Sequence, residues 1–316
     1  MSRKIKLAVV APVYNEGDIL EKFHAQLVMA LKKIKKIDYS ILYVADRSTD
    51  NTGEILKSIT TSDKKTRALI LSSRFGHQVS LFAGIENSLD ADAILMMDSD
   101  LQHPPAVIPK LLDRFLQGYE VVFTFRSRSV KTSPLRQALG KSFYSLFSFL
   151  SEIPIPNNSA DFRIISRRIA RILVSEFPER NLFLRGIFPW MGFRQAGLEY
   201  QEAPRGGRGK SKYSLARMAR LALHGILSFS TMPLRLGIFL GLAFSTFSFV
   251  MMGWAIWAFF SYKTIPEGWT TLIVLQLLFS GIQLIVLGIL GLYLGGLCEE
   301  VKKRPRYLVE NDLRHE

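Results

Sequence analysis

The chain has 316 residues, and its 41 Lys and Arg against 27 Asp and Glu give a formal net charge of +14. Between Leu236 and Cys298 the only charged residues are Lys263 and Glu267, although the whole chain has a mean hydropathy of only +0.16. This division excludes a wholly soluble globular chain, a disordered chain and a transporter that lies in the membrane throughout. Cys298 is the only cysteine, which excludes an intrachain disulfide, and no Cys/His cluster indicates zinc.

Short apolar runs rich in Ile, Val and Leu alternate with helical stretches through residues 5–125. This alternation predicts a parallel, doubly wound sheet, in which ligands bind at the carboxyl ends of the strands. We expect strands at Ile5–Val13, Ser40–Ala45, Thr66–Leu71, Ala93–Met97 and Glu120–Phe125. The expected helices are Asp18–Ile37, Thr49–Thr61, Gln78–Ser88 and Pro105–Gln117.

Acidic residues follow three of these strands. Glu16 comes shortly after the first, Asp46 follows the second, and Asp98 and Asp100 follow the fourth. Because crowded carboxylates need a cation or hydrogen-bond donors nearby, the pair Asp98 and Asp100 is a candidate site for Mg²⁺ or Mn²⁺ shared with a diphosphate. Neither familiar glycine-rich phosphate loop is present, so a metal-bridged diphosphate is the expected way to hold a nucleotide. An Asp-x-Asp pair by itself is weak evidence, because surface turns use Asp freely.

A basic amphipathic pattern occupies Tyr213–Met232. Arg217, Arg220 and His224 fall at i, i+3 and i+7, with apolar residues on the other faces. The pattern predicts a helix on the membrane surface, and the alternative is a domain helix with a solvated basic side.

Two apolar runs without a charge follow, at Gly237–Phe260 and Trp269–Leu297. Each is longer than the roughly 20 residues that cross a bilayer, and the short polar linker between them predicts a helical hairpin rather than two buried helices of a soluble core. Basic residues lie before the first run and after the second, which predicts that both termini are cytoplasmic. These residues are Arg217, Arg220 and Arg235 before, and Lys302, Lys303, Arg304 and Arg306 after.

Several blocks together resemble the family 2 (GT-A fold) glycosyltransferases, and more narrowly the polyprenyl-phosphate glycosyltransferases, over almost the whole chain. The blocks are Ala11–Glu16 (APVYNE), Ser73–Gly76 (SRFG) with Gly84, Met97–Pro105 (MDSDLQHPP), Ala160–Arg163 (ADFR), Phe183–Gly186 (FLRG) and Gly209–Tyr213 (GKSKY). Their order ahead of two apolar helices looks like the bactoprenol glucosyltransferase branch, with dolichol-phosphate mannose synthases as more distant relatives.

The resemblance implies an α/β fold: a GT-A (Rossmann-like), mostly parallel sheet domain over residues 1–212, an amphipathic interface helix over 213–235 and a two-helix transmembrane hairpin within 236–298. Residues 299–316 are then a cytoplasmic tail. The implied enzyme is a multi-pass protein of the inner (plasma) membrane. It moves glucose from UDP-glucose to undecaprenyl phosphate, inverts the anomeric centre, uses Mg²⁺ or Mn²⁺, and serves the cell envelope. Relatives associate, so a homo-oligomer is plausible.

The resemblance also assigns roles to residues. Asp98 and Asp100 hold the metal, and Asp161 is the catalytic aspartate beside the acceptor, either as a base or by orienting the attacking phosphate. A lipid phosphate is largely ionised at pH 7, so a strong base is less essential than cations that bring two phosphates together. The donor-binding residues are Pro12, Tyr14, Glu16, Asp46, Asp98 and Ser99, and Asp100 is also counted as catalytic. The candidates for the acceptor phosphate are Arg126, Arg128, Arg163, Arg185, Arg205 and Lys212.

The charge distribution agrees with an anionic lipid partner. Residues 1–125 hold 16 basic and 15 acidic side chains, whereas residues 126–235 carry a net charge of +13. The excess therefore lies in the half expected to meet a lipid phosphate, which favours a membrane partner over nucleic acid.

The chain departs from the family pattern at two places. Relatives have Asp-Asp-Gly-Ser where this chain has Ala45-Asp46-Arg47-Ser48, and Lys210 stands where an acid is frequent. Ala45 and Arg47 leave open a non-catalytic, membrane-tethered nucleotide-sugar sensor. The donor sugar is not readable from the sequence, so transfer of another sugar, such as mannose from GDP-mannose or an amino sugar, is the other alternative. A processive polysaccharide synthase is disfavoured because no Gln-x-x-Arg-Trp motif or further apolar helix is present.

Overall fold

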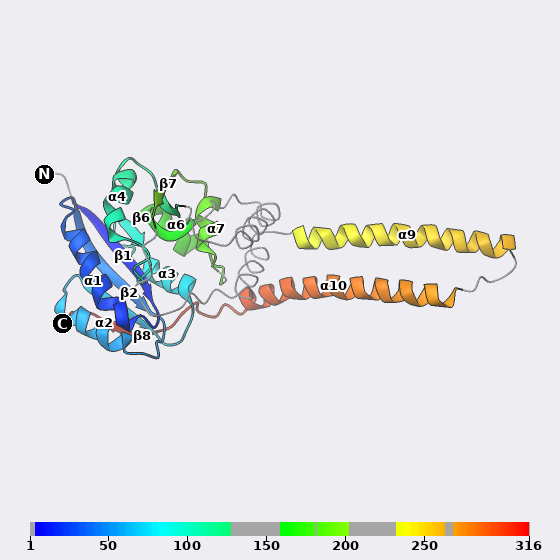
Figure 1. Cartoon of the computed structure of the whole chain (residues 1–316), viewed down its shortest axis with the longest axis horizontal. Coiled ribbons are helices and arrows are strands. Elements are labelled where there is room, and N and C mark those ends of the chain that lie inside the picture. Colours follow the sequence, from blue (N-terminus) through cyan, green and yellow to red (C-terminus); the bar gives the residue numbers. More distant parts are fainter. Residues whose placement is uncertain (1–3, 128–158, 181, 202–231, 263–267, 316) are drawn as a thin grey trace. The chain divides into compact units, whose positions relative to one another are not determined.

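The computed structural model describes residues 4–127, 159–180, 182–201, 232–262 and 268–315. The chain divides into two units (Figure 1). One is an α/β unit that includes Arg304–Glu316, and the other contains two long helices.

Within the described residues, eight strands form one sheet in the order β7-β5-β6-β4-β1-β2-β3-β8. The centre is parallel: β1 pairs in parallel with β2 and β4, and β2 pairs in parallel with β3. Strand β6 runs antiparallel between β4 and β5, and β8 is antiparallel to β3. The bounds are Ile5–Val13 (β1), Ile37–Ala45 (β2), Thr66–Leu71 (β3), Ala93–Met96 (β4), Val121–Arg126 (β5), Ser159–Ser166 (β6), Gln195–Tyr200 (β7) and Val309–Leu313 (β8).

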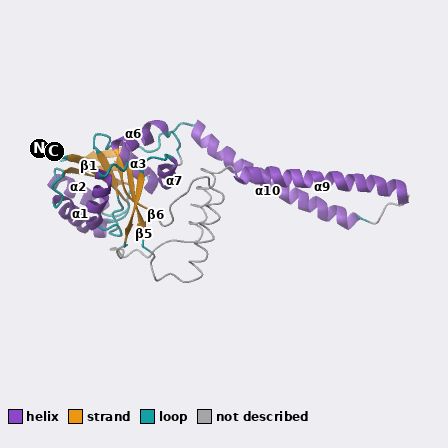
Figure 2. Ribbon diagram, turned by 90° about the horizontal axis from the view of Figure 1, so that it is seen from above, coloured by secondary structure: helices purple, strands orange, loops and turns teal. Residues whose placement is uncertain are grey.

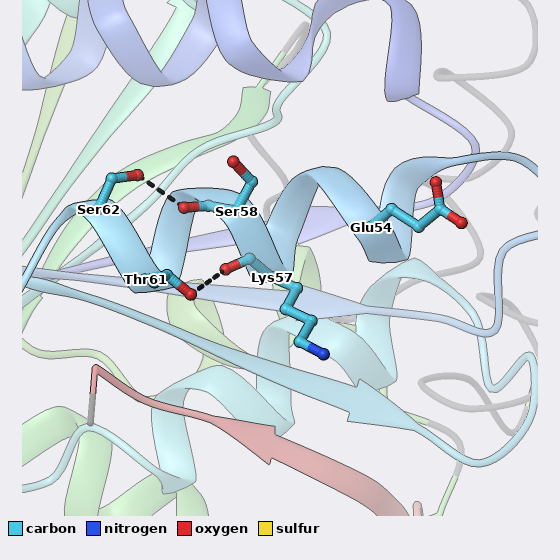
Figure 3. A pocket seen from close by; sticks show the side chains of 5 residues that line it. All are labelled: Glu54, Lys57, Ser58, Thr61 and Ser62. Atoms are coloured by element: carbon cyan, nitrogen blue, oxygen red, sulfur yellow. Dashed lines mark hydrogen bonds between the residues drawn. The ribbon is translucent and has the colours of Figure 1, made fainter.

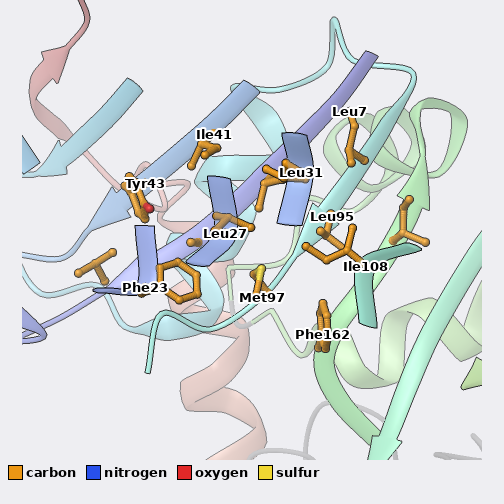
Figure 4. Packing of buried hydrophobic residues seen from close by; sticks show 14 of the residues in the cluster. Leu7, Phe23, Leu27, Leu31, Ile41, Tyr43, Leu95, Met97, Ile108 and Phe162 are labelled. Atoms are coloured by element: carbon orange, nitrogen blue, oxygen red, sulfur yellow. The ribbon is translucent and has the colours of Figure 1, made fainter. Parts of the chain in front are cut away.

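Helices cover both faces of this sheet (Figure 2). On one face the apolar sides of α1 (Gly17–Lys32), α2 (Thr52–Ser62) and α4 (Ile108–Leu116) share a core with alternate residues of β1 (Figure 4). Phe23, Leu27 and Leu31 of α1 are buried there, at the i, i+4, i+8 spacing of one helix face. On the other face, α3 (His77–Glu86) packs against β1 and β2 and beside α6 (Arg167–Glu176).

The approach of α3 to the sheet depends on Gly84. A Cβ at this position would lie 2.1 Å from Val10 Cγ1 of β1. A glycine lets the helix backbone lie directly on the strand, which places the first turn of α3 beside the carboxyl ends of β1 and β4.

The mostly parallel α/β fold and the five expected strands are confirmed. Some boundaries are wrong. Helix α2 begins at Thr52, not at Thr49, and α1 ends at Lys32, not at Ile37. Ile37 instead begins β2, where it pairs with Ile5 and is buried. Strands β6, β7 and β8 were not expected from the sequence.

Residues 304–313, which we expected to belong to a tail, are bound to the α/β unit. Strand β8 extends the sheet beside β3, and Asp312 of β8 forms a bidentate ion pair with Arg67 of β3 at 2.7 and 2.8 Å. Just before β8, Tyr307 donates a hydrogen bond to Glu86 at the end of α3. The Arg306 guanidinium stacks over the Phe82 ring at 4.2 Å. Side chains of residues 306–312 therefore bind α3 and β3.

The second unit consists of α9 (Met232–Tyr262) and α10 (Trp269–Val301). Phe244 of α9 and Phe279 of α10 meet edge to face, with ring centroids 5.5 Å apart. Two segments, Leu236–Trp254 and Leu278–Val301, are long and apolar enough to cross a bilayer, with mean hydropathies of 1.9 and 2.0. The interface helix expected at 213–235 lies almost wholly outside the described residues.

Candidate active site

The first part of the candidate site is the loop after β1, held by the loop after β2. Asn15 has a positive φ of 53°. Its backbone N–H donates to Ser48 Oγ, and its side-chain oxygen accepts from the Thr49 N–H at 2.8 Å. Glu16 N–H donates to Thr52 Oγ1. The strained Asn15 backbone is therefore fixed from several directions at a strand end, which is typical of functional loops.

Asp46 ties the loop after β2 to the loop before α3. Its two carboxylate oxygens accept hydrogen bonds from the backbone N–H groups of Phe75 (3.1 Å) and Gly76 (2.9 Å), and Ser80 Oγ donates to it. Gly76 has φ +96°, which glycine adopts without strain. Asp46 is only 4% exposed, so its contacts shape the segment that leads to His77.

The centre of the site is Asp98, which follows β4 and lies between the side chains of His77 and His103. His77 Nε2 is 2.7 Å from Asp98 Oδ1, and His103 Nε2 is 3.6 Å from Asp98 Oδ2. Burial by itself would raise the pKa of Asp98, but the His103 and His77 imidazoles outweigh it and lower that pKa to about 2. Burial likewise opposes charge on His77, yet Asp98 raises the pKa of His77 to about 9. Asp98 is therefore a carboxylate at neutral pH.

His77 also reaches the second acidic centre. Its Nδ1 is 3.8 Å from Asp161 Oδ2, so one imidazole lies between the aspartates of β6 and of the β4 end. Arg185 holds Asp161 in a bidentate ion pair, with Nε–Oδ1 at 2.9 Å and Nη2–Oδ2 at 2.7 Å. The buried Arg163 lies 3.7 Å from the same carboxylate. Burial disfavours charge on Asp161, but Arg185 above all, with His77 and Arg163, holds its pKa well below its usual range.

Gln78 joins these groups to α7 (Leu184–Trp190). Its side-chain amide donates to Asp161 Oδ2 at 3.5 Å and accepts from the Leu184 N–H at 3.1 Å. The guanidinium of Arg163 donates to the Ala160 carbonyl and stacks over Phe188 at 4.9 Å. Gln78 of α3 and Arg163 of β6 thus support the Asp161–Arg185 pair.

The structure brings most of the expected site residues to this edge of the sheet. Ser99 Oγ donates to the Pro12 carbonyl at 2.9 Å, which joins the ends of β1 and β4. Asp100 accepts from the Gln102 N–H and is followed by Leu101 at φ 66°. Two other expected residues are placed less centrally: the Tyr14 ring lies beneath Arg74 at 4.2 Å, and Arg126 Nε donates to the Tyr200 hydroxyl at 3.4 Å. Arg128, Arg205 and Lys212 lie outside the described residues.

Three central residues were absent from the expected site: His77, Gln78 and His103. His77 and Gln78 directly follow the Ser73–Gly76 block, and His103 lies inside the Met97–Pro105 block, so their place in those blocks was the available signal. The contacts of these three residues with Asp98 and with β6 depend on the pairing of β4 with β6, which the local sequence pattern does not reveal.

A hollow of about 520 Å³ lies elsewhere, along α2 (Figure 3). It is lined by Glu54, Lys57, Ser58, Thr61 and Ser62, all from that one helix. Thr61 and Ser62 donate their hydroxyls to carbonyls of their own helix. Functional groups from different elements do not converge there, so the strand-end cluster is the better candidate site.

Comparison with known proteins identifies the family. The model of the family described as glycosyl transferase family 2 matches residues 8–173, which include Asp46, Asp98 and Asp161. The chain belongs to glycosyl transferase family 2. It is a glycosyltransferase, and the residues that the family model matches also include His77 and His103 but end before Arg185.

Relatives match this glycosyltransferase over nearly its full length. The uncharacterized glycosyltransferase YkcC of Bacillus subtilis is 36% identical over 98% of this chain and 95% of its own. The bactoprenol glucosyl transferase of Shigella phage SfII is 34% identical over 98% of this chain and 99% of its own. Among solved structures, mannosyl-3-phosphoglycerate synthase from Rubrobacter xylanophilus is similar with a TM-score of 0.47 and 15% identity, over 70% of this chain and 71% of that one.

Proposed function

We propose that this glycosyltransferase transfers glucose from UDP-glucose to undecaprenyl phosphate at the cytoplasmic face of the membrane. The observation that carries the proposal is the state of Asp161. Both of its oxygens are bound by Arg185, and its pKa is held well below the usual range. A carboxylate in this state is a poor general base, because proton transfer is most efficient when the pKa of the base is near the working pH.

An acceptor phosphate removes the need for such a base. A sugar hydroxyl must lose a proton as it attacks, whereas a phosphate monoester has a second pKa near 6 and is already largely dianionic at pH 7. A phosphate oxygen then attacks the anomeric carbon while the bond from that carbon to UDP breaks, and the electron pair leaves with UDP. One in-line displacement turns an α-linked donor into a β-linked lipid phosphate sugar without a proton transfer.

The cationic residues around Asp161 suit the binding of that acceptor. The Arg185 side chain is 34% exposed, although its Nε and Nη2 atoms face Asp161. Asp161 fixes the orientation of this guanidinium, and a planar guanidinium can bind phosphate through two parallel hydrogen bonds. We assign Asp161 the role of orienting Arg185, and Arg163 the role of adding positive charge from the buried side.

Asp98 and Asp100 fit a divalent cation. Asp98 is ionised and its side chain is 27% exposed, and oxygen ligands of this kind suit Mg²⁺ and Mn²⁺, which retain phosphate oxygens as further ligands. No group of three or more candidate ligands occurs in the described part of the chain, so the proposed site relies on the donor diphosphate for further ligands. A cation bound there would neutralise charge on the departing diphosphate.

The apolar helices support the membrane assignment. The chain leaves the α/β unit before α9 and, after α10, contributes β8 to the sheet of the same unit. This order of elements supports a hairpin that crosses the bilayer, with the catalytic unit on one side. The bactoprenol glucosyl transferase relatives act by name on a lipid carrier, which supports a membrane-bound acceptor.

The test is a donor and acceptor screen with purified full-length enzyme in detergent. Radiolabelled UDP-glucose, UDP-galactose, UDP-N-acetylglucosamine or GDP-mannose is supplied with Mn²⁺ and either undecaprenyl phosphate or undecaprenol. We expect a labelled lipid only with undecaprenyl phosphate, formed fastest from UDP-glucose. Product from undecaprenol, or a lack of product with every donor, would refute the proposal, whereas faster transfer of another sugar would correct the donor alone. Asp98→Asn serves as the inactive control.

A further inference from the structure

His103 is a buried residue at the candidate site for which the proposed reaction has no role so far. It is 1% exposed, and its ring stacks on Phe162 with centroids 5.1 Å apart and meets Tyr200 edge to face. Phe162 is the neighbour of Asp161 in β6. The imidazole therefore lies between the Asp98 end of β4 and the strand that carries Asp161.

The hydrogen bonds of His103 determine its tautomer. Its Nδ1 accepts the backbone N–H of Asp98 at 2.9 Å, so Nδ1 carries no hydrogen. The neutral imidazole must then carry its hydrogen on Nε2. This Nε2 is the one buried side-chain nitrogen or oxygen in the described part of the chain that lacks a hydrogen-bond partner. A buried donor of this kind calls for an explanation, because leaving it unsatisfied is costly.

The nearest acceptor for that hydrogen is Asp98 Oδ2, at 3.6 Å, just beyond hydrogen-bonding distance. The other oxygen, Oδ1, faces His77, whose side chain is 42% exposed. Asp98 thus has one oxygen on the accessible side and one directed at a buried donor. Carboxylates that bind metals are usually oriented in this way by a hydrogen bond from outside the ligand set.

We propose that His103 is a positioning residue that holds Asp98 by its backbone and by Oδ2, so that Oδ1 is presented to a divalent cation. The inference rests on the proposed role of Asp98 as a metal ligand. Asp98 Oδ1, which His77 contacts, would be the oxygen that holds the cation, and the Nε2 hydrogen of His103 would secure Oδ2. His103 itself does not bind the cation, because the lone pair on its Nδ1 accepts the backbone N–H of Asp98.

Two substitutions separate this role from a purely structural one. In His103→Asn the side-chain oxygen can still accept the Asp98 N–H, but nothing replaces Nε2. In His103→Gln the longer amide can place a donor near the Nε2 position. Both variants lose the ring contacts with Phe162 and Tyr200, so both should lose thermal stability to a similar extent. Only metal binding should distinguish them.

The measurement is Mn²⁺ binding to the full-length enzyme in detergent, followed by the electron paramagnetic resonance signal of free Mn²⁺ with UDP present and no acceptor. We expect His103→Asn to weaken binding about 10-fold or more, the range seen when such an orienting partner is removed. We expect His103→Gln to bind more tightly than His103→Asn. His24→Asn is the matched control, because His24 is a part-buried histidine of α1 that bonds Tyr43 far from Asp98 in the sequence.

Each outcome has a defined meaning. Equal Mn²⁺ affinity in His103→Asn, His103→Gln and the unaltered enzyme would overturn the inference while leaving the metal site intact. Failure of the unaltered enzyme to bind Mn²⁺ would overturn both the inference and the proposed role of Asp98. If neither variant folds, the unaltered enzyme with ¹⁵N-labelled histidine provides the test: His103 should carry its hydrogen on Nε2, and adding Mg²⁺ and UDP should shift that nitrogen. A hydrogen on Nδ1, or an unmoved resonance, would refute the inference.

Discussion

Replacing Asp161 with Asn tests whether this carboxylate orients an arginine or removes a proton. The substitution keeps the shape of the side chain but removes the negative charge that faces Arg185 at 2.7 Å and Arg163 at 3.7 Å. Arg163 is buried, with a side chain that is 3% exposed, and burial already lowers its pKa to about 10 despite Asp161. Leaving a buried charge without its partner typically costs about 3–5 kcal/mol.

The thermal effect follows from that free energy. For a domain of this size each kcal/mol lowers the midpoint of unfolding by about 2–4 °C, so Asp161→Asn should unfold about 6–20 °C earlier. A double-mutant cycle with Arg185→Gln measures the coupling, which we expect to be about 0.5–3 kcal/mol in favour of the pair. Tryptophan fluorescence in detergent reports both values.

The rate–pH profile separates the two roles. A carboxyl with a depressed pKa in the folded state stabilises the fold above its unfolded value near 4, and this contribution is lost only as the pH falls through the lower, folded value. The Asp161–Arg185 pair is therefore unchanged between pH 5 and 8. In that window the rate should rise with the second ionisation of the acceptor phosphate, near pH 6.

If Asp161 orients Arg185, then Asp161→Asn lowers the rate and raises the KM for the acceptor, but the midpoint of the profile stays near pH 6. If instead the rise in rate near pH 6 reflects Asp161 acting as a general base, the substitution removes this rise from the rate–pH profile. Added formate or imidazole then restores activity. Loss of the rise in rate near pH 6, together with restored activity in formate or imidazole, would refute the orienting role of Asp161. It would also remove the main support for a phosphate acceptor.

Three further substitutions test the scaffold and the metal site. Gly84→Ala would place a methyl group 2.1 Å from Val10 Cγ1, so it should lower the free energy of unfolding by about 1–3 kcal/mol, as measured by thermal unfolding. Gly53→Ala is the control: a Cβ there has no neighbour within 4 Å, so the free energy of unfolding should be unchanged or higher by up to about 1 kcal/mol. Arg67→Ala removes a partly exposed ion pair, so it should destabilise the protein by no more than about 1 kcal/mol yet speed hydrogen exchange at residues 309–313. Asp98→Asn should abolish Mn²⁺ binding in the presence of UDP and reduce transfer at least about 100-fold, and activity that survives in this variant would contradict the metal assignment.

The first half of the fold could be predicted because its signals are local. Strands β1 to β4 each contain a run of apolar residues, and the helices between them have a regular apolar face. The end of α1 was misjudged because Lys33–Lys36 continues a helical pattern, whereas Ile37 is required by its pairing with Ile5. Strand β8, with the sequence Val-Glu-Asn-Asp-Leu, has no strand signal of its own and forms through pairing with the distant β3.

The same distinction applies to the site. Asp46, Asp98 and Asp161 could be proposed because acids at strand ends and family blocks mark them. The pairing of Asp161 with Arg185 and the position of His77 between two aspartates depend on which strand ends are adjacent. That adjacency follows from the antiparallel insertion of β6 beside β4, which is a property of the assembled sheet.

Strand β8 also sets an order of assembly during synthesis. It follows α9 and α10 in the chain, so β8 is synthesised, and the sheet can be completed, only after both apolar helices. Until then β3 is an open edge, with unpaired backbone groups that can recruit another strand. Pairing of β8 with β3 closes that edge and binds α3 through Tyr307 and Arg306. A nascent chain that stops before β8 would thus expose an aggregation-prone strand, so completion of the catalytic unit is coupled to synthesis of the hairpin.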